Sequence, residues 1–171
     1  MVYPEKRKKL SKKKEKNEIE KARETAFRFL SYRSRSVLEV KRKLQEKEFS
    51  PHTIRTTISR LMELGYLNDQ EYAATVVRSS IENKQCGPIR IHDALVKKGI
   101  AKEIIDNTLE ELTKEYDLTR VARLAFDSKF SLHQDQLAEE KTRRKVIGYL
   151  KRKGFSWNTI LAVIKSADLQ D

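Results

Sequence analysis

The sequence contains very little of what an all-β or a disulfide-stabilised protein requires. It has only five glycines and three prolines among 171 residues, and the tight turns of an all-β fold are built largely from these two residue types. Their scarcity therefore favours helices. Cys86 is the only cysteine, which excludes a disulfide within the chain and indicates a reducing, cytoplasmic location.

Long apolar segments are also absent from the sequence. No run of about 18 apolar residues occurs, so no segment is expected to span a membrane. The charged N-terminal segment lacks the apolar stretch of a secretory signal peptide. We therefore expect a cytoplasmic protein without a membrane partner.

Positive charge is what the sequence has in excess. The 37 lysines and arginines outnumber the 25 acidic residues and give a net charge of +12, with an isoelectric point of about 9.7. A surplus of this size suggests a polyanionic partner, and nucleic acid is favoured over a membrane surface. A basic protein without such a partner remains the alternative interpretation.

A pattern of apolar residues occurs three times along the chain. In each copy a leucine stands five residues before another apolar residue, and two further apolar residues follow at helical spacing. The copies are Leu44, Phe49, Ile54 and Ile58, then Leu95, Ile100, Ile105 and Leu109, and finally Leu150, Phe155, Ile160 and Ile164. A repeat of about 50 residues with helical spacing inside it indicates an array of small helical units.

Helix start and stop signals divide each repeat into three helices. Ser36 and Glu39 have the spacing of a capping box, Ser50-Pro51 is a strong helix start, and Gly65 is a typical residue after a helix end. The predicted helices begin near Ile19, Ser36 and Ser50 in the first repeat, span 68–81, 87–99 and 101–112 in the second, and span 116–129, 139–153 and 156–167 in the third. The predicted organisation is a flexible basic arm at 1–17, followed by three-helix repeats at 18–67, 68–114 and 115–169.

The sequence offers no constellation of catalytic or metal-binding residues. His52, His92 and His133 lack the partner histidine or cysteine pair of a metal site. No glycine-rich phosphate loop is present, and Cys86 has no histidine or asparagine context that would make it a nucleophile. We therefore expect neither enzymatic activity nor a cofactor or metal.

Basic residues are the candidate binding groups, and they cluster around the second helix of each repeat. The clusters are Arg33, Arg35, Lys41, Arg42 and Lys43, then Lys97 and Lys98, and then Lys141, Arg143, Arg144, Lys145, Lys151, Arg152 and Lys153. A series of positive helices at equivalent positions suits a phosphate backbone or the acidic groove of an elongated partner. Ordinary solvation remains the alternative for each cluster taken alone.

A helix-turn-helix DNA-binding protein is an alternative, because a basic helix of a three-helix unit could enter a major groove. Against it, the third helices at 53–64, 103–112 and 159–167 are too apolar or too acidic for base recognition. A helical-repeat adaptor for another acidic protein is a second alternative.

Four separated segments resemble the RecX regulatory proteins of bacteria. They are LSYRSRSVLEVKRKL at 30–44, GYLNDQEYAATVVRS at 65–79, GPIRIHDALVKKGI at 87–100 and LKRKGFSWNTI at 150–160. The resemblance implies an all-α fold of three tandem three-helix repeats in an elongated, curved array. It assigns structural roles to Leu30, Leu44, Tyr72, Ala73, Leu95, Ile100 and Phe155.

The resemblance also implies a function. RecX proteins bind the filament of the RecA recombinase on single-stranded DNA and modulate it, as a rule by inhibiting recombination, ATPase and co-protease activities, without catalysis of their own. We expect a monomer whose basic clusters contact RecA or single-stranded DNA, with double-stranded DNA as a further candidate partner. Similar proteins from Gram-positive bacteria often have an additional N-terminal segment where this chain has only the lysine-rich arm, so a truncated chain or a shorter family member is expected.

Overall fold

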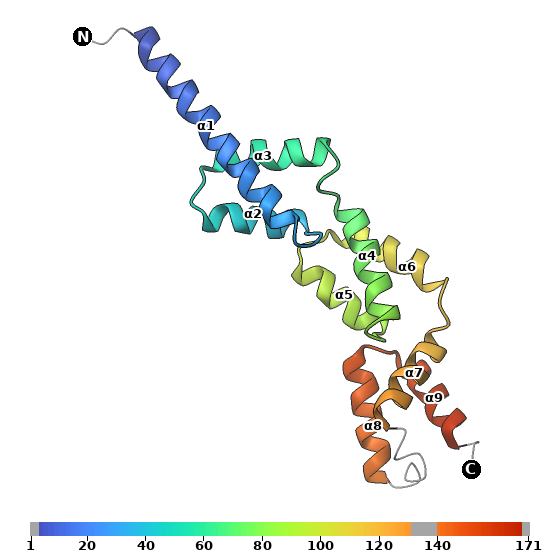
Figure 1. The fold of residues 1–171 in the computed structure, drawn as a ribbon. Coiled ribbons are helices and arrows are strands. Elements are labelled where there is room, and N and C mark those ends of the chain that lie inside the picture. Colours follow the sequence, from blue (N-terminus) through green and yellow to red (C-terminus); the bar gives the residue numbers. More distant parts are fainter. Residues whose placement is uncertain (1–3, 131–139, 169–171) are drawn as a thin grey trace. The chain divides into compact units, whose positions relative to one another are not determined.

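The computed structural model describes residues 4–130 and 140–168, and over these ranges the helices are joined only by turns and short loops (Figure 1). The helices are α1 (Pro4–Leu30), α2 (Val37–Glu46), α3 (Pro51–Glu63), α4 (Asp69–Glu82), α5 (Pro88–Lys97), α6 (Lys102–Thr113), α7 (Leu118–Phe130), α8 (Glu140–Lys153) and α9 (Trp157–Asp168). Every predicted helix is present, and no strand occurs in this part of the chain. The prediction of an all-α fold is confirmed.

The first helix begins earlier than the sequence predicted. α1 starts at Pro4 and not near Ile19. The intervening segment is filled mostly with lysine and glutamate, which are good helix formers, and no glycine or proline interrupts it. The flexibility expected of residues 1–17 and the three repeat boundaries stay predictions.

Serine caps start three of the helices, as the sequence indicated. Ser36 and Glu39 form a complete capping box at α2. The hydroxyl of Ser50 accepts the Thr53 N–H at 3.3 Å, and that of Ser156 accepts the Thr159 N–H at 3.2 Å. Each hydroxyl satisfies one of the N–H groups that a helix start leaves without an intrahelical partner.

The helices fall into two compact units, an N-terminal unit at Met1–Tyr72 and a C-terminal unit at Ala73–Asp171. The division lies within α4. The N-terminal unit therefore contains α1 to α3 with the first residues of α4, and the C-terminal unit contains the remaining helices.

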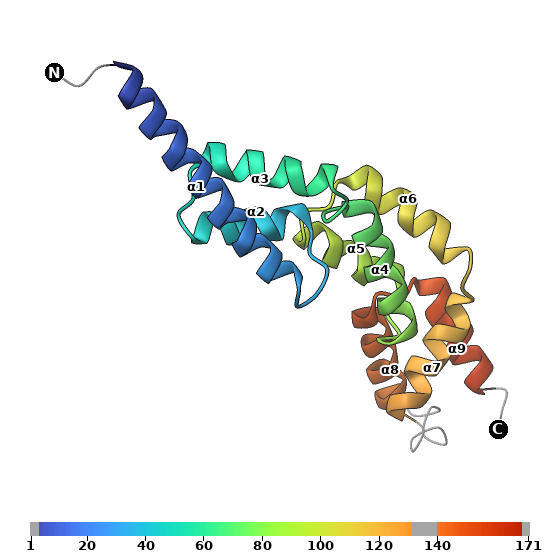
Figure 2. The same ribbon diagram turned by 45° about the horizontal axis from the view of Figure 1, so that its top comes forward.

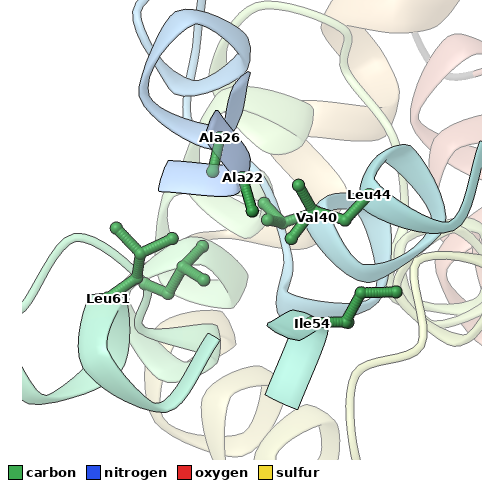
Figure 3. Packing of buried hydrophobic residues seen from close by; sticks show 7 residues of the cluster. Ala22, Ala26, Val40, Leu44, Ile54 and Leu61 are labelled. Carbon is green, nitrogen blue, oxygen red and sulfur yellow. The ribbon is translucent and has the colours of Figure 1, made fainter. Parts of the chain in front are cut away.

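The repeated leucines are core residues of their repeats. Leu44, Leu95 and Leu150 are all fully buried. Burial of one such side chain contributes about 1.5–3 kcal/mol to the stability of the fold. In the N-terminal unit the apolar side chains converge between α1, α2 and α3 (Figure 3), and this cluster consists of Ala22, Ala26, Val40, Leu44, Ile54, Leu61 and Leu67. The repeated pattern is thus scaffold.

Two carboxylates hold separate elements of the N-terminal unit together. Glu18 of α1 accepts hydrogen bonds from the Ser50 N–H at 2.8 Å and from the Thr53 hydroxyl at 2.9 Å. Asp69 at the start of α4 accepts the Val37 N–H at 2.9 Å. Because the Ser50 and Val37 N–H groups lie at helix starts, each carboxylate fixes its own helix against the beginning of another.

The second and third repeats meet through a backbone joint in the C-terminal unit. The Gly87 N–H donates to the Lys153 carbonyl at 2.8 Å, and the Ile89 N–H donates to the Gly154 carbonyl at 3.2 Å. The start of α5 therefore lies against the end of α8 (Figure 2). A Cβ on Gly87 would stand 2.3 Å from the Gly154 carbonyl oxygen, and one on Gly154 would stand 2.3 Å from the Arg90 nitrogen. Only glycine permits this approach at either position.

Candidate binding surfaces

Helix α8 separates a buried apolar side from an exposed basic side. Thr142, Val146 and Leu150 are buried, at spacings of four residues that place them on one face of the helix. The exposed side chains form what we call the α8 basic face: Lys141, Arg144, Lys145, Lys151 and Arg152. At 14 residues the helix extends over about 21 Å, so the charges are spread along a line and not concentrated at a point.

Most of the charge on the α8 basic face is not neutralised within the described residues. Arg144 forms an ion pair with Glu140, with 2.8 Å between Nε and Oε1. Lys141, Lys145 and Lys151 have no ion pair among the described residues. Arg143 is half-buried and Lys153 is turned toward the joint, so neither belongs to the exposed row.

The joint between the repeats forms a basic hollow that we call the joint pocket. It has a volume of about 470 Å³ and is lined by three cationic side chains, Lys84, Arg90 and Lys153, with no carboxylate in its lining. Backbone carbonyls orient these cations. Lys153 Nζ donates to the Lys84 carbonyl at 2.6 Å, and Arg90 Nη1 donates to the Arg152 carbonyl at 3.3 Å.

The joint pocket contains two cations that the sequence analysis did not select. Lys84 follows α4 and Arg90 lies in the first turn of α5, and neither belongs to a run of basic residues. Packing of α5 against the end of α8 brings them to Lys153. A signal was available in the unusual Gly87-Pro88 and Gly154 positions, which indicate close backbone approach.

The basic cluster of the first repeat is divided by its internal contacts. Arg33 Nη2 lies 2.8 Å from Glu39 Oε1, and this hydrogen bond raises the pKa of the Arg33 guanidinium. The Arg35 guanidinium lies 4.1 Å from the centre of the Phe29 ring, and Lys43 Nζ lies 2.9 Å from Glu46. The cluster's two remaining members, Lys41 and Arg42, are exposed without an ion pair among the described residues.

The second repeat combines charge with exposed apolar side chains. Lys97 is exposed at the end of α5, and Lys98 is the half-buried residue that follows. Ile89 and Val96 of the same helix are 57% and 52% exposed. Side chains of this kind lose contact with water when a protein partner covers them, so α5 suits a protein surface as well as a phosphate.

The residues considered for metal or nucleophile chemistry have ordinary surroundings. His52 Nε2 lies 2.8 Å from Glu15 Oε1, and His92 Nδ1 lies 3.5 Å from Asp93 Oδ1. His133 lies outside the described residues. Cys86 is buried. Within the described part of the chain no three His, Cys, Asp or Glu side chains are grouped as metal ligands would be. None of the described helices has the length and apolarity of a membrane span.

Tandem three-helix repeats with basic helix surfaces define a helical-repeat protein. Family models for the first, second and third three-helix domains of RecX match residues 22–61, 68–109 and 115–164. The chain belongs to the RecX family. Both the resemblance found in the sequence and the three-repeat architecture are thereby confirmed.

Curated relatives carry the name regulatory protein RecX. The chain is 32% identical to that of Trichlorobacter lovleyi over 130 residues, which are 76% of this chain and 84% of the relative. It is 33% identical to that of Bacillus subtilis over 157 residues, which are 91% of this chain and 58% of the relative. The chain is thus similar to RecX proteins of quite different lengths.

Solved structures agree with the sequence comparison. The crystal structure of RecX from Lactobacillus salivarius superposes with a TM-score of 0.78 at 27% identity, covering 90% of this chain and 98% of that one. A second crystal structure, of a regulatory protein RecX, gives a TM-score of 0.80 at 25% identity and covers 96% of this chain and 79% of that one.

Proposed function

We propose that this chain binds the RecA recombinase–single-stranded DNA filament and inhibits its recombination, ATPase and co-protease activities. Membership of a family named for regulation supports this function. The observation that carries the proposal is the α8 basic face, a row of exposed cations that lack ion pairs within the described residues. The protein acts by occupying the filament, without catalysis, cofactor or metal, as a monomer in the cytoplasm beside RecA.

The basic surfaces of the C-terminal unit suit contact with the DNA and the protein of such a filament. Lysines 141, 145 and 151 provide point charges for phosphates, whereas the guanidinium of Arg152 can donate two parallel hydrogen bonds to one phosphate or carboxylate. The joint pocket adds Lys84, Arg90 and Lys153 close by. The exposed Ile89 and Val96 of α5 provide apolar area for RecA itself.

The remaining basic residues selected from the sequence are expected to contribute unequally to binding. Lys41, Arg42 and Lys97 are exposed and contribute directly to binding. Arg33, Arg35 and Lys43 share their charge with nearby carboxylates, so each contributes less. Lys98 and Arg143 are both half-buried, so each exposes less of its side chain to a partner.

The test is titration of this protein into RecA that hydrolyses ATP on single-stranded DNA. We expect wild type to lower the ATPase rate at stoichiometric concentration. The double variant K145E/K151E should require roughly tenfold more protein for the same inhibition. The matched control is R120E/K165E, which changes the net charge equally at exposed residues of α7 and α9.

Wild type and the two variants together distinguish an error in the proposed function from an error in the role of the α8 basic face. If wild type leaves the ATPase rate unchanged, the proposed function is wrong. If R120E/K165E weakens inhibition as much as K145E/K151E, net charge governs binding and the α8 basic face has no special role.

A further inference from the structure

The N-terminal unit has an open groove between α1 and α3 that no basic run in the sequence indicates. Its volume is about 530 Å³. Arg23 of α1 lines it on one side, and Arg55 and Arg60 of α3 line it on the other. Glu63 is the one carboxylate in the lining.

Two of the three arginines of the α1/α3 groove form no ion pair with another described residue. Arg23 and Arg55 are exposed and form no ion pair there. Arg60 shares its charge with Glu63 at 3.0 Å, in a pair whose side chains are both more than half exposed, so the pair is weak and can be exchanged for a ligand. Glu18 of α1 is engaged by the start of α3, and Glu15 of α1 lies against His52, which is itself a lining residue.

Hydroxyl groups complete the polar lining of the α1/α3 groove. Thr56 and Ser59 are exposed at its rim. Thr57, which also lines the groove, is fully buried, and its hydroxyl has no hydrogen-bond partner among the described residues. Buried polar atoms are nearly always paired in proteins, so an unpaired one beneath a row of arginines indicates a surface suited to a polar, anionic ligand.

We propose that the α1/α3 groove binds the phosphodiester backbone of single-stranded nucleic acid. Guanidinium groups donate paired hydrogen bonds to phosphate oxygens, and hydroxyls donate single ones. No Phe, Tyr or Trp ring lines the groove, and its one imidazole, that of His52, is held by Glu15 at 2.8 Å. Contact is therefore expected mainly through phosphates, which is independent of base sequence. The proposal goes beyond the RecA-directed function, because the groove holds DNA whether or not RecA is present.

A phosphodiester chain fits the α1/α3 groove better than an acidic peptide does. Tightly bound protein partners bury aromatic or aliphatic anchors in apolar pockets, and the only large aliphatic side chain in this lining is Ile19. A nucleic acid strand needs no such anchor, because it carries a charge on every residue and draws its affinity from phosphate contacts.

The α1/α3 groove adds phosphate contact to a third helix that the sequence excluded only from base recognition. The apolar residues of 53–64 face the core, and the exposed side of α3 carries Arg55, Thr56 and Ser59. In the first repeat the strongest anion surface therefore lies on α1 and α3. The cluster around α2, which the sequence favoured, is partly neutralised by Glu39 and Glu46.

The experiment measures fluorescence anisotropy of a labelled oligothymidylate with this protein in the absence of RecA. We expect R23Q/R55Q to bind roughly tenfold more weakly than wild type at moderate salt. The slope of log affinity against log salt should become shallower by about 1.4, which corresponds to two lost phosphate contacts on a single strand. R28Q/K47Q is the matched control, since it removes the same charge from exposed residues of the same unit outside the groove. It should change affinity less than about twofold.

A conservative variant and a competitor sharpen the test. R23K/R55K should keep the salt slope of wild type and lose affinity, because lysine retains the charge without the paired donors. The proposal is overturned if wild type does not bind the oligonucleotide, or if R23Q/R55Q and R28Q/K47Q lose affinity equally. It is also overturned if polyglutamate displaces the labelled strand as efficiently as unlabelled oligothymidylate, because the groove is then a site for acidic protein segments.

The RecA ATPase assay on R23Q/R55Q distinguishes this inference from the proposed function. If R23Q/R55Q inhibits RecA normally and binds DNA as tightly as wild type, only the proposal for the α1/α3 groove is refuted. If R23Q/R55Q loses DNA binding and wild type does not affect RecA, the RecA-directed function is refuted and the proposal for the groove stands. Because both arginines are exposed, the thermal unfolding midpoint of the variant should equal that of wild type.

Discussion

At the scale of single residues, a few carboxylates determine which basic side chains remain available to a partner. Glu39 is the clearest case, with a side chain that is only 13% exposed and that lies within 4 Å of both Arg33 and Arg35. It also accepts a hydrogen bond from the Tyr72 hydroxyl at 3.2 Å, and burial together with this negative charge raises the pKa of Tyr72. Arg33 and Arg35 therefore stabilise the fold through Glu39 and have less charge available to a partner.

Glu18 makes the stability of the N-terminal unit depend on pH. The hydrogen bond from the Ser50 N–H, followed by that from the Thr53 hydroxyl, lowers the pKa of the Glu18 carboxyl. A carboxyl with a lowered pKa in the folded protein contributes stability that is present above its unfolded pKa and lost as the pH falls through its folded pKa. That contribution should therefore begin to decline below about pH 4 and disappear below the folded pKa of Glu18.

Replacement of Glu18 by glutamine tests this dependence. E18Q should unfold at lower urea concentration than wild type near neutral pH. The difference should shrink as the pH falls below about 4, and it should vanish below the folded pKa of Glu18, where both side chains are neutral. The measurement is the urea midpoint from circular dichroism at several pH values. E24Q, at an exposed residue of the same helix, is the control. A difference for E18Q that stays constant with pH contradicts the argument.

At the scale of elements, the joint between α5 and α8 is where we expect substitutions to be tolerated least. Gly154 has a φ of 88°, a conformation that side chains with a Cβ rarely adopt. It also approaches the Arg90 backbone so closely that a Cβ would overlap it. Two separate constraints therefore act on this one residue, whereas the helix end at Gly65 imposes only the first.

Gly65 provides the comparison for the joint. Its φ is 75°, and a Cβ there would meet nothing within 4 Å. The free energy of unfolding of G65A should therefore fall by about 1–2 kcal/mol, the cost of the left-handed conformation alone. That of G154A should fall by about 2–4 kcal/mol, because the steric overlap is added. Chemical unfolding followed by circular dichroism measures both, and equal losses would show that the joint can open at little cost.

At the scale of the whole molecule, each compact unit carries its own basic surface, which we propose as a binding site for anions. The N-terminal unit has the α1/α3 groove, and the C-terminal unit has the α8 basic face with the joint pocket. One chain that links two weak sites for the same polymer binds a long strand more tightly than either site alone, because the second contact forms within the complex.

This linkage predicts a dependence on DNA length. Wild type should bind an oligothymidylate of about 60 nucleotides more tightly than one of about 8 nucleotides, by a factor well beyond the number of overlapping sites. R23Q/R55Q and K145E/K151E should each remove most of that gain, since each leaves a single surface. Anisotropy titrations with both lengths measure the ratio. A gain retained in both variants would mean that the two surfaces do not share one strand.

Much of the architecture could be read from the sequence because helix signals are local. Ser36, Ser50 and Gly65 mark helix ends through contacts within a few residues, and the repeated leucines mark the core through a period that any helix imposes. The start of α1 escaped prediction for the same reason. Its lysine-rich segment has helix propensity but no apolar period that would identify it as a helix.

The helices, the threefold repeat and the RecX family could be recognised from the order of the residues alone, because periodicity and capping act between neighbouring residues. Which charges are available to a partner depends on how the helices pack. Arg23 and Arg55 line one groove between α1 and α3, and Lys84 and Lys153 line one pocket at the joint. Each pair is separated along the chain by more residues than helical periodicity can relate. The pairing of Arg33 with Glu39 and the close approach of Gly87 to Gly154 likewise depend on how the chain packs. The availability of a charge is a property of its three-dimensional neighbours, and only the fold specifies those.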